Sequence, residues 1–358
     1  MQQQDLFDLL DQRTVNLCAG SGGWDQGGRI LGLNLGTEGI EWNRDAVTTA
    51  RAAGHRRRLV DLRTIDPTEY HHCTGMIASP PCPTFSAGGT RSGLGSDYQH
   101  VLDVWTSIGW GISAEDALAD LEAAGIADER TKLLATAGVW ALSLMTSGAC
   151  EWVAFEQVPA VEFAWEDLAA EFFSIGCEYV NVGVLDAADF GVPSRRKRAF
   201  LVASTHGRTS TALDLATSGS ELVCPGYLPL PGNGPQRSMA AALGWEPGHQ
   251  VITRGNRRPT GGNAFSADRP AWCLTGKARS WEREDGLRLT PQEAGFLSGF
   301  PKDYPWTGSR TAAFQQAGDV VSPVMAAHVL AGAIGIDPGT RIDAYLSTMY
   351  ADDLEMAA

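Results

Sequence analysis

The stretch Ile77-Ala78-Ser79-Pro80-Pro81-Cys82-Pro83-Thr84-Phe85-Ser86 decides the fold. It continues a short apolar run that begins at Gly75 and predicts a buried strand, and the two prolines end that strand because proline cannot donate to a sheet ladder. Cys82 therefore lies just past a strand end. In open α/β sheets, ligands and catalytic groups collect at the carboxyl ends of strands. The thiol is thus a candidate nucleophile, the alternative being a small buried apolar residue.

The composition places the chain among large α/β proteins. It has 358 residues, 44% of them hydrophobic, which is enough for a sizeable core and more than one domain. No run of about 18 apolar residues and no basic-then-apolar start are present, so we expect no membrane span and a cytoplasmic location. The seven cysteines include no Cys-x-x-Cys pair, which argues against a disulfide framework and against a zinc site. We therefore expect no metal.

The charge distribution leaves a nucleic-acid partner open. A formal net charge of −14 argues against one, because Lys and Arg carry the contacts to phosphate. Basic residues nevertheless cluster at Arg195 to Arg198, Arg254 to Arg258 and Lys277 to Arg283. Such clusters could form a local basic groove or simply a solvated face, and for a further cluster, Arg56 to Arg58, we expect a solvated face.

Three motifs near the start favour an adenosine-bearing cofactor. A predicted strand, Thr14 to Cys18, runs into the glycine-rich turn Ala19 to Trp24, which lets the backbone approach a ligand closely. The next strand ends at Glu41-Trp42, an acid that could accept from ribose hydroxyls and an indole that could stack on a purine. A third unit, Arg58 to Leu62, places another acid, Asp61, beyond the second predicted helix. Singly, these residues could equally be a tight turn, surface carboxylates and a core tryptophan.

The rest of the chain predicts a mainly parallel, doubly wound sheet followed by a smaller domain. A strand from Glu151 to Phe155 ends at Glu156, and alternating helices and strands continue to Ala203. Arg196 and Arg198 share one face if their segment is extended. Residues 204–270 are rich in Gly, Pro, Ser and Thr and predict a second, irregular domain, and Phe314 to Ile334 reads as a final helical stretch.

Taken in order, these motifs resemble the cytosine-5 DNA methyltransferases over about residues 14–330. The segments that carry the resemblance are Asn16 to Gly23, Glu41-Trp42, Asp61, Pro80-Pro81-Cys82, Glu156-Gln157-Val158, Gly191 to Arg198, Arg288 to Pro301 and Gly318-Asp319-Val320-Val321. The resemblance implies an S-adenosylmethionine-dependent, Rossmann-like methyltransferase fold with a mainly parallel doubly wound sheet and a small irregular target-recognition domain. By position it implies residues 1–203 with 312–345 as the catalytic and cofactor-binding domain, 204–287 as the target-recognition domain, 288–311 as a hinge region and 346–358 as a C-terminal tail.

The resemblance also assigns roles to individual residues. The S-adenosyl-L-methionine site would comprise Cys18, Ala19, Gly20, Ser21, Gly23, Glu41, Trp42, Asp61, Leu62, Pro81, Asp319 and Val320. The catalytic residues would be Cys82, Glu156, Arg196, Arg198 and Gln157, with Cys82 attacking carbon-6 of a flipped cytosine so that carbon-5 can accept a methyl group. Double-stranded DNA would be bound by Ser86, Gly88, Gly89, Arg91, Arg254, Arg257 and Arg258.

Some positions depart from the family pattern. Gln157 and Asp319 both stand where the family usually has Asn, and Asp319 would lie close to the methionine end of the cofactor. The segment Ser86 to Glu129 is long for the family. Its added pair of helices could contact DNA or a partner, but the segment is acidic, which favours helices that pack only on the outside.

Other functions stay open at this point. An RNA cytosine-5 methyltransferase is one, although the signature of the tRNA-directed branch is not found. A catalytically inert DNA-binding homologue is another, and a dinucleotide oxidoreductase would leave Cys82 and the arginine pair without a role. For a DNA methyltransferase we expect a place in restriction-modification, a cognate restriction endonuclease in the same system without a stable complex, and association with the nucleoid through DNA.

Overall fold

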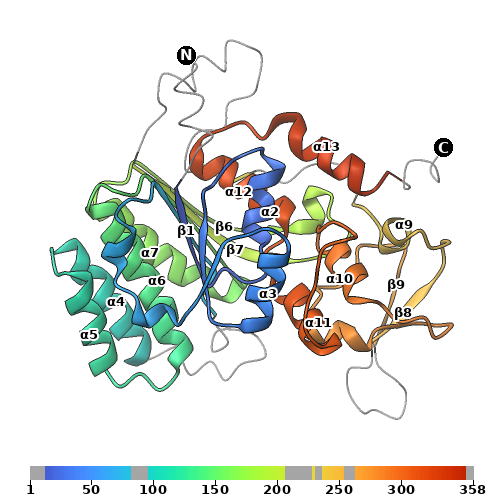
Figure 1. Ribbon diagram of the computed structural model, residues 1–358, viewed down its shortest axis with the longest axis horizontal. Helices are drawn as coiled ribbons and strands as arrows, with labels where there is room; N and C mark the ends of the chain where they lie inside the picture. The colour runs from blue at the N-terminus through green and yellow to red at the C-terminus, as the bar shows by residue number, and fades with distance from the viewer. Residues whose placement is uncertain (1–12, 82–95, 206–227, 230–235, 254–262, 352–358) are drawn as a thin grey trace.

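The computed structural model describes residues 13–81, 96–205, 228–229, 236–253 and 263–351. Its central feature is a seven-stranded sheet with the strand order β3-β2-β1-β4-β5-β7-β6 (Figure 1). The strands are β1 (Thr14–Leu17), β2 (Glu38–Glu41), β3 (Arg57–Leu59), β4 (Gly75–Ala78), β5 (Trp152–Gln157), β6 (Tyr179–Asp186) and β7 (Lys197–Ser204). The predicted α/β class with a doubly wound sheet is confirmed.

One strand runs against the others. The neighbours from β3 across to β5 pair in parallel, whereas β7 pairs antiparallel with both β5 and β6. The chain returns from β6 to β7 through the short connection 187–196, which contains only the 3₁₀ turn η4 (Ala187–Phe190). A parallel crossover needs a dozen or more residues, so this connection permits only the antiparallel arrangement.

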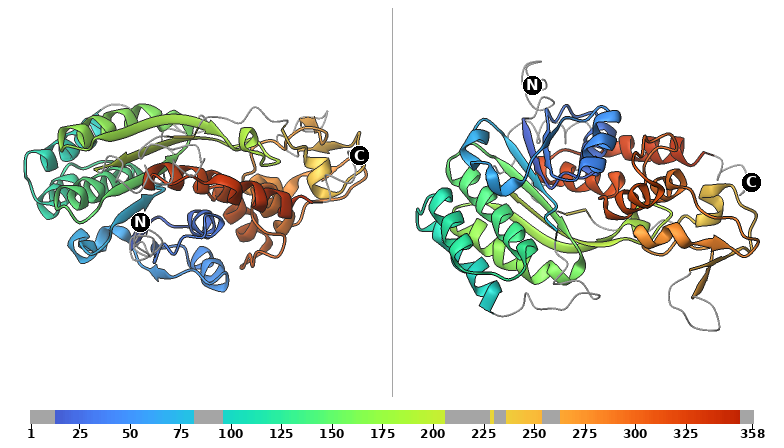
Figure 2. Two further views of the ribbon diagram at one scale, coloured as in Figure 1. Left: turned by 90° about the horizontal axis from the view of Figure 1, so that it is seen from above. Right: turned by 60° about the horizontal axis from the view of Figure 1, so that its bottom comes forward.

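Helices cover both faces of the sheet. The alternation of side chains sends Met76 and Ala78 of β4 toward one helical layer and Ile77 toward the other. The first layer contains α4 (Ser96–Gly109), α5 (Ala114–Ala123), α6 (Glu129–Thr146) and α7 (Glu162–Ser174), and the second contains α2 (Gly23–Ile30) and α12 (Pro323–Ile334). Figure 2 shows the sheet between these two layers. Burial on both faces explains why the central strands read as continuous apolar runs.

The helices of the long acidic segment are part of the core. Trp105 of α4 is fully buried and donates its indole N–H to the carbonyl of Ala135 on α6, at 3.0 Å. Gly138 is the α6 residue on which it packs, since a Cβ there would lie 2.2 Å from the indole nitrogen. The helix α5, in turn, packs on α4 and α6. The described part of this segment therefore extends the first helical layer.

The predicted helical stretch from Phe314 to Ile334 is wrong in one respect, because the structure breaks it. The helix α11 (Arg310–Asp319) ends where Val320 becomes extended, and α12 begins with Pro323 at its first turn. Proline disfavours helical geometry in the residue before it, which accounts for the break at Ser322. Arg310–Ile334 has the length and apolar composition of a membrane span, but 83% of its most apolar window is buried inside the structure.

A second, smaller core lies beside the sheet. It contains an antiparallel sheet of β8 (Gln250–Ile252), β9 (Ala264–Ser266) and β10 (Glu282–Arg283), with α9 (Met239–Leu243), α10 (Pro291–Leu297) and the buried face of α11. The chain then continues into α13 (Gly339–Met349), and Tyr350 is buried, so the residues assigned to a tail begin as packed structure. The domain boundaries given above remain a prediction.

Short segments complete the fold. They are α3 (Arg44–Ala52) and the 3₁₀ turns η1 (Leu62–Thr64), η2 (Pro67–Tyr70), η3 (Pro159–Val161) and η5 (Gly276–Ser280). Asn43 caps α3 by accepting from the backbone N–H groups of Asp45 and Ala46. This cap fixes the chain directly after Glu41 and Trp42.

Candidate active site

A cavity of about 700 Å³ lies along one edge of the large sheet. β1, β2, β4 and β5 end at this edge, and β7 begins there because it runs in the opposite direction. The chain passes from β3, on one side of β1, to β4 on the other, so the cavity lies at a topological switch point. Open α/β sheets bind their ligands at such points.

The glycine loop, residues 18–23, forms one end of the cavity. Cys18 and Gly20 both have left-handed backbone, with φ of 54° and 53°, and Cys18 is the one described non-glycine residue with positive φ. A Cβ on Gly23 would lie 2.1 Å from the carbonyl oxygen of Val321, so this position accepts only glycine. Burial, with the charges of Glu41 and Asp61, raises the pKa of the Cys18 thiol. Cys18 is therefore a protonated wall residue at neutral pH.

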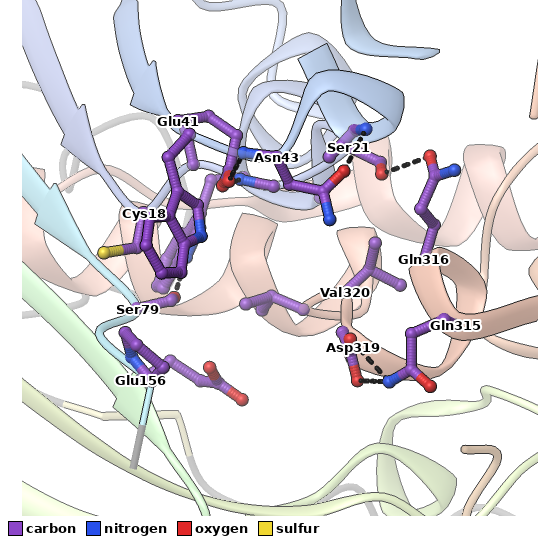
Figure 3. Close-up of a pocket in the computed structure, with 18 of the residues that line it drawn as sticks. Cys18, Ser21, Glu41, Asn43, Ser79, Glu156, Gln315, Gln316, Asp319 and Val320 are labelled. Atoms are coloured by element: carbon purple, nitrogen blue, oxygen red, sulfur yellow. Dashed lines mark hydrogen bonds between the residues drawn. The ribbon is translucent and has the colours of Figure 1, made fainter. Parts of the chain in front are cut away.

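The carboxylate of Glu41 holds two backbone N–H groups at the end of β2. One oxygen accepts from Gly20 at 2.9 Å, and the other accepts from Asn43 at 2.7 Å (Figure 3). Trp42 is 65% exposed and lines the cavity, which leaves its ring free for stacking. The strand end thus combines an ordered carboxylate with an exposed aromatic face.

Asp61 has a partner that the sequence did not indicate. Its carboxylate accepts from the Arg63 guanidinium, with the shortest contact at 2.6 Å, and also from the Arg63 backbone N–H at 3.0 Å. The hydrogen bonds from the Arg63 side chain hold the pKa of Asp61 below its ordinary value. Asp61 therefore enters the cavity as a fixed carboxylate.

Arginines and a carboxyl group form the opposite wall. Arg198 Nε lies 2.9 Å from the Glu156 carboxylate, and Arg196 Nη1 donates to the carbonyl of Gly318 at 2.8 Å. Arg196 is buried, and its Nε–H has no partner among the described residues. Burial and the charge of Arg198 lower the pKa of Arg196 to about 10, so it stays cationic at neutral pH. An unsatisfied buried donor at a cavity wall is a binding group for an acceptor oxygen.

Two further polar residues complete this side. The Gln157 amide donates to the carbonyl of Pro80 at 2.5 Å, which ties the end of β5 to the chain that follows β4. Asp319 accepts from the Gln315 amide at 2.8 Å, and the surrounding walls desolvate its carboxyl group enough to raise its pKa. Figure 3 shows the side chains of Glu156, from β5, and Asp319, from α11, both extending into the cavity.

Comparison with known proteins gives a family match for part of the chain and a likeness of fold for most of it. Residues 12–106, which contain the glycine loop, Glu41, Asp61 and Cys82, match the family of C-5 cytosine-specific DNA methylases. Over this segment the chain is similar to the cytosine-5 DNA methyltransferases. The matched residues supply the parallel half of the sheet and one end of the cavity.

Individual relatives extend this comparison. The chain is 26% identical to the type II methyltransferase M1.HphI of Haemophilus parahaemolyticus over 182 residues, which are 45% of this chain and 49% of that protein. It is also 26% identical to the type II methyltransferase M.AplI of Arthrospira platensis over 345 residues, 89% of this chain and 85% of that protein. The crystal structure of the S. pombe Dnmt2 methyltransferase has the same fold, with a TM-score of 0.56 at 13% identity over 90% of this chain and 98% of that one.

The cavity brings together the predicted cofactor and catalytic residues that the structure describes. All of the predicted cofactor residues line it, together with Glu156, Gln157, Arg196 and Arg198. Cys82 lies outside the described residues, as do Ser86, Gly88, Gly89, Arg91, Arg254, Arg257 and Arg258. Among the described residues, no group of three or more His, Cys, Asp or Glu side chains could hold a metal ion.

Several residues that line the cavity were missed by the sequence reasoning. They are Trp24, Asn43, Ser79, Arg130, Gln315 and Gln316, among others. Gln315 and Gln316 could have been found, because they stand directly before the Gly318-Asp319 motif on one helix. Arg130 carried no such signal, since its place at the cavity follows from the packing of α6.

Proposed function

We propose that this protein is a DNA (cytosine-5)-methyltransferase that uses S-adenosyl-L-methionine, flips a cytosine out of double-stranded DNA and methylates carbon-5. The observation that carries the proposal is the single cavity in which the glycine loop and Glu41 face Glu156, Arg196 and Arg198. The family match supports the reaction class, and the type II methyltransferase names of its relatives support a role in restriction-modification.

The residues present fit the cofactor. A Cβ at Gly20 would have no heavy atom within 4 Å, so the loop leaves open space against its backbone. A cavity of about 700 Å³ accommodates a nucleoside with an attached amino acid beside a base. In our proposal the loop residues Cys18, Ala19, Gly20, Ser21 and Gly23 hold the methionine end, with Pro81, Asp319 and Val320 nearby.

The strand ends hold the nucleoside part of the cofactor. Glu41 accepts from the ribose hydroxyls, and Trp42 stacks on the adenine. Asp61 and Leu62 contact the adenine edge, where a fixed carboxylate suits the exocyclic amino group. When bound, S-adenosylmethionine supplies an electrophilic methyl group.

The chain's own residues prepare the cytosine. The Cys82 thiolate adds to carbon-6, so an S–C6 bond forms and the electrons of the C5–C6 double bond make carbon-5 nucleophilic. Glu156 holds a proton at N3 and contacts the exocyclic amino group, while Arg196 and Arg198 bind the base carbonyl. Gln157 positions the Pro80 carbonyl ahead of Cys82. Loss of the carbon-5 proton to a base then breaks the S–C6 bond and restores the thiolate.

The test is nucleoside mass spectrometry after incubation with S-adenosylmethionine, with DNA and RNA as separate substrates. Cys82→Ala is compared with Cys273→Ala, which removes an exposed thiol that does not line the cavity. We expect new 5-methylcytosine in DNA with the native chain and Cys273→Ala, and none with Cys82→Ala. Product in RNA alone would establish the RNA alternative, and binding of cofactor without product in either substrate would indicate an inert homologue.

The proposal also includes the setting in which the enzyme works. We expect it to act in the cytoplasm on the nucleoid, beside a cognate restriction endonuclease that forms no stable complex with it. The recognition sequence would be set by the region 204–287, including Arg254, Arg257 and Arg258, which could read base edges in the major groove. Ser86, Gly88, Gly89 and Arg91 would belong to a segment that contacts the DNA.

A further inference from the structure

Two side chains hold the glycine loop by donating hydrogen bonds to three of its successive backbone carbonyls. Arg57 Nη2 and Nε donate to the carbonyls of Ala19 and Gly20, at 3.4 and 3.2 Å. The hydroxyl of Tyr304 donates to the next carbonyl, that of Ser21. Arg57 does not line the cavity, and neither does Tyr304. These two side chains therefore act on the loop from the side away from the ligand.

Arg57 is itself fixed in a buried ion pair. Its Nη1 and Nη2 lie 3.1 and 2.6 Å from the two carboxylate oxygens of Asp25, the third residue of α2. The Arg57 side chain is fully buried, and that of Asp25 is 7% exposed. Burial would raise the pKa of Asp25, but the charge and hydrogen bonds of Arg57 hold it below its ordinary value. A buried pair of this kind resists movement because displacing either partner leaves an uncompensated charge.

Tyr304 is fixed by aromatic packing from the other half of the chain. Its ring centroid lies 4.6 Å from that of Phe300 and 4.9 Å from that of Trp306. There is no spare room between these groups and the loop, since a Cβ at Gly22 would lie 2.6 Å from both the Tyr304 hydroxyl and the His55 ring. The Tyr304 and His55 side chains therefore fill the space on the side of the loop that faces away from the cavity.

We propose that Arg57 and Tyr304 are positioning residues that hold the glycine loop in the conformation that binds the cofactor. The left-handed backbone at Cys18 is not the conformation that a free non-glycine residue prefers, and the glycines at positions 20 and 22 have many other conformations open to them in a free segment. Binding the carbonyls on one side leaves the opposite side of the loop to the ligand. A loop ordered in advance loses less conformational entropy on binding and so has higher affinity. The identity of the ligand rests on the proposed function above.

The first experiment compares Tyr304→Phe with Tyr350→Phe. Both tyrosines are buried and donate to a backbone carbonyl, Tyr350 to that of Phe296 at 2.9 Å, but only Tyr304 contacts the loop. Isothermal titration calorimetry with S-adenosylhomocysteine on the full chain measures affinity without turnover. We expect about a five- to tenfold weaker Kd for Tyr304→Phe and a change below about twofold for Tyr350→Phe. The KM for S-adenosylmethionine should follow the Kd, with kcat unchanged.

The second experiment compares Arg57→Lys with Arg29→Lys. Arg29 also donates to two backbone carbonyls, those of Ala53 and Gly54, but not to the loop. Lysine keeps the charge beside Asp25 and loses the planar fork that reaches Ala19 and Gly20. We expect at least a fivefold weaker Kd for Arg57→Lys and a native-like Kd for Arg29→Lys.

Equal affinities within both pairs of variants would overturn the positioning role. A native chain that does not bind S-adenosylhomocysteine would instead overturn the proposed cofactor, and this inference with it. A Tyr304→Phe variant whose kcat falls while its Kd stays native would also contradict the inference, because it would place the hydroxyl in the chemical step. Thermal denaturation of all four variants separates these results from general loss of stability.

Discussion

The two walls of the cavity differ in the strands that build them. The loop wall, defined as residues 18–23 with Glu41 and Asp61, follows the carboxyl ends of parallel strands. The arginine wall, defined as Glu156, Arg196 and Arg198, combines the end of β5 with the start of the antiparallel β7. The loop wall presents carboxylates ordered by backbone N–H groups, and the arginine wall presents guanidinium donors.

This difference indicates a division of labour. A wall of fixed acceptors and open backbone suits the hydroxyl and amino groups of a nucleoside cofactor. A wall of cationic donors, of which Arg196 is buried, suits a base carbonyl on which negative charge develops during reaction. Substitutions on the loop wall should therefore change cofactor affinity, and those on the arginine wall should change turnover.

The largest effect is expected at Glu156. Glu156→Gln removes the group proposed to hold a proton at N3, so kcat should fall by about 100- to 1,000-fold while the Kd for S-adenosylhomocysteine stays within about twofold. Glu171→Gln is the control. The Glu171 carboxylate also accepts a hydrogen bond, from the Thr106 hydroxyl, but it lies on α7 and does not line the cavity. Single-turnover methylation assays measure the rate. A loss of cofactor affinity as large as the loss of rate would contradict the assignment of cofactor binding to the loop wall and of turnover to the arginine wall.

A smaller effect concerns His55, which is buried behind the loop wall, and His328, which is half-buried on α12. Burial lowers the pKa of both His55 and His328 from 6.5 to about 4, and the neighbouring charges of Asp25, Arg29 and Arg57 also act on His55. The unfolded chain takes up these protons near pH 6.5, whereas the folded chain does so only near pH 4. The free energy of unfolding should therefore fall as the pH drops from 6.5 to 4, by about 2 to 3 kcal/mol for each histidine.

Single variants separate the two histidines. His328 lies on α12 with its ring 4.9 Å from that of Phe190, so His328→Leu should remove its share of the pH dependence without changing cofactor affinity. His55 packs behind Gly22, so His55→Asn should reduce the pH dependence and weaken S-adenosylhomocysteine binding as well. Urea denaturation at several pH values measures the first effect. Identical slopes in all three proteins would show that neither ring is held neutral by the fold.

The smallest effect is expected at Glu41. Glu41→Gln keeps one acceptor oxygen and loses the other, so one of the contacts to Gly20 and Asn43 is lost. The KM for S-adenosylmethionine should rise about tenfold, corresponding to about 1.4 kcal/mol, with little change in kcat. Glu38→Gln on the same strand is the control, because Glu38 accepts from the Tyr70 hydroxyl and does not line the cavity. A fall in kcat with unchanged KM would place Glu41 in the chemical step.

The residues that could be predicted share a local signal. The glycine loop, Glu41 and Glu156 stand directly after apolar runs that form strands, and strand ends of a parallel sheet meet at one edge. The supporting residues carry no such signal. Arg57 looked like part of a solvated basic run from Arg56 to Arg58, yet it is buried against Asp25 and the loop.

The sequence by itself determined the order of strands and turns, and with it the groups that would reach the carboxyl edge, because these depend on local patterns of two to ten residues. Only the tertiary structure decided which side chains support these residues from the side away from the cavity. Tyr304 reaches Ser21 across 283 residues of sequence, and Gln316 reaches the same serine across 295. Contacts of this separation depend on how α11 and the segment after α10 pack against α2 and α3. That packing is set by summed burial over many side chains, which no short stretch of sequence records.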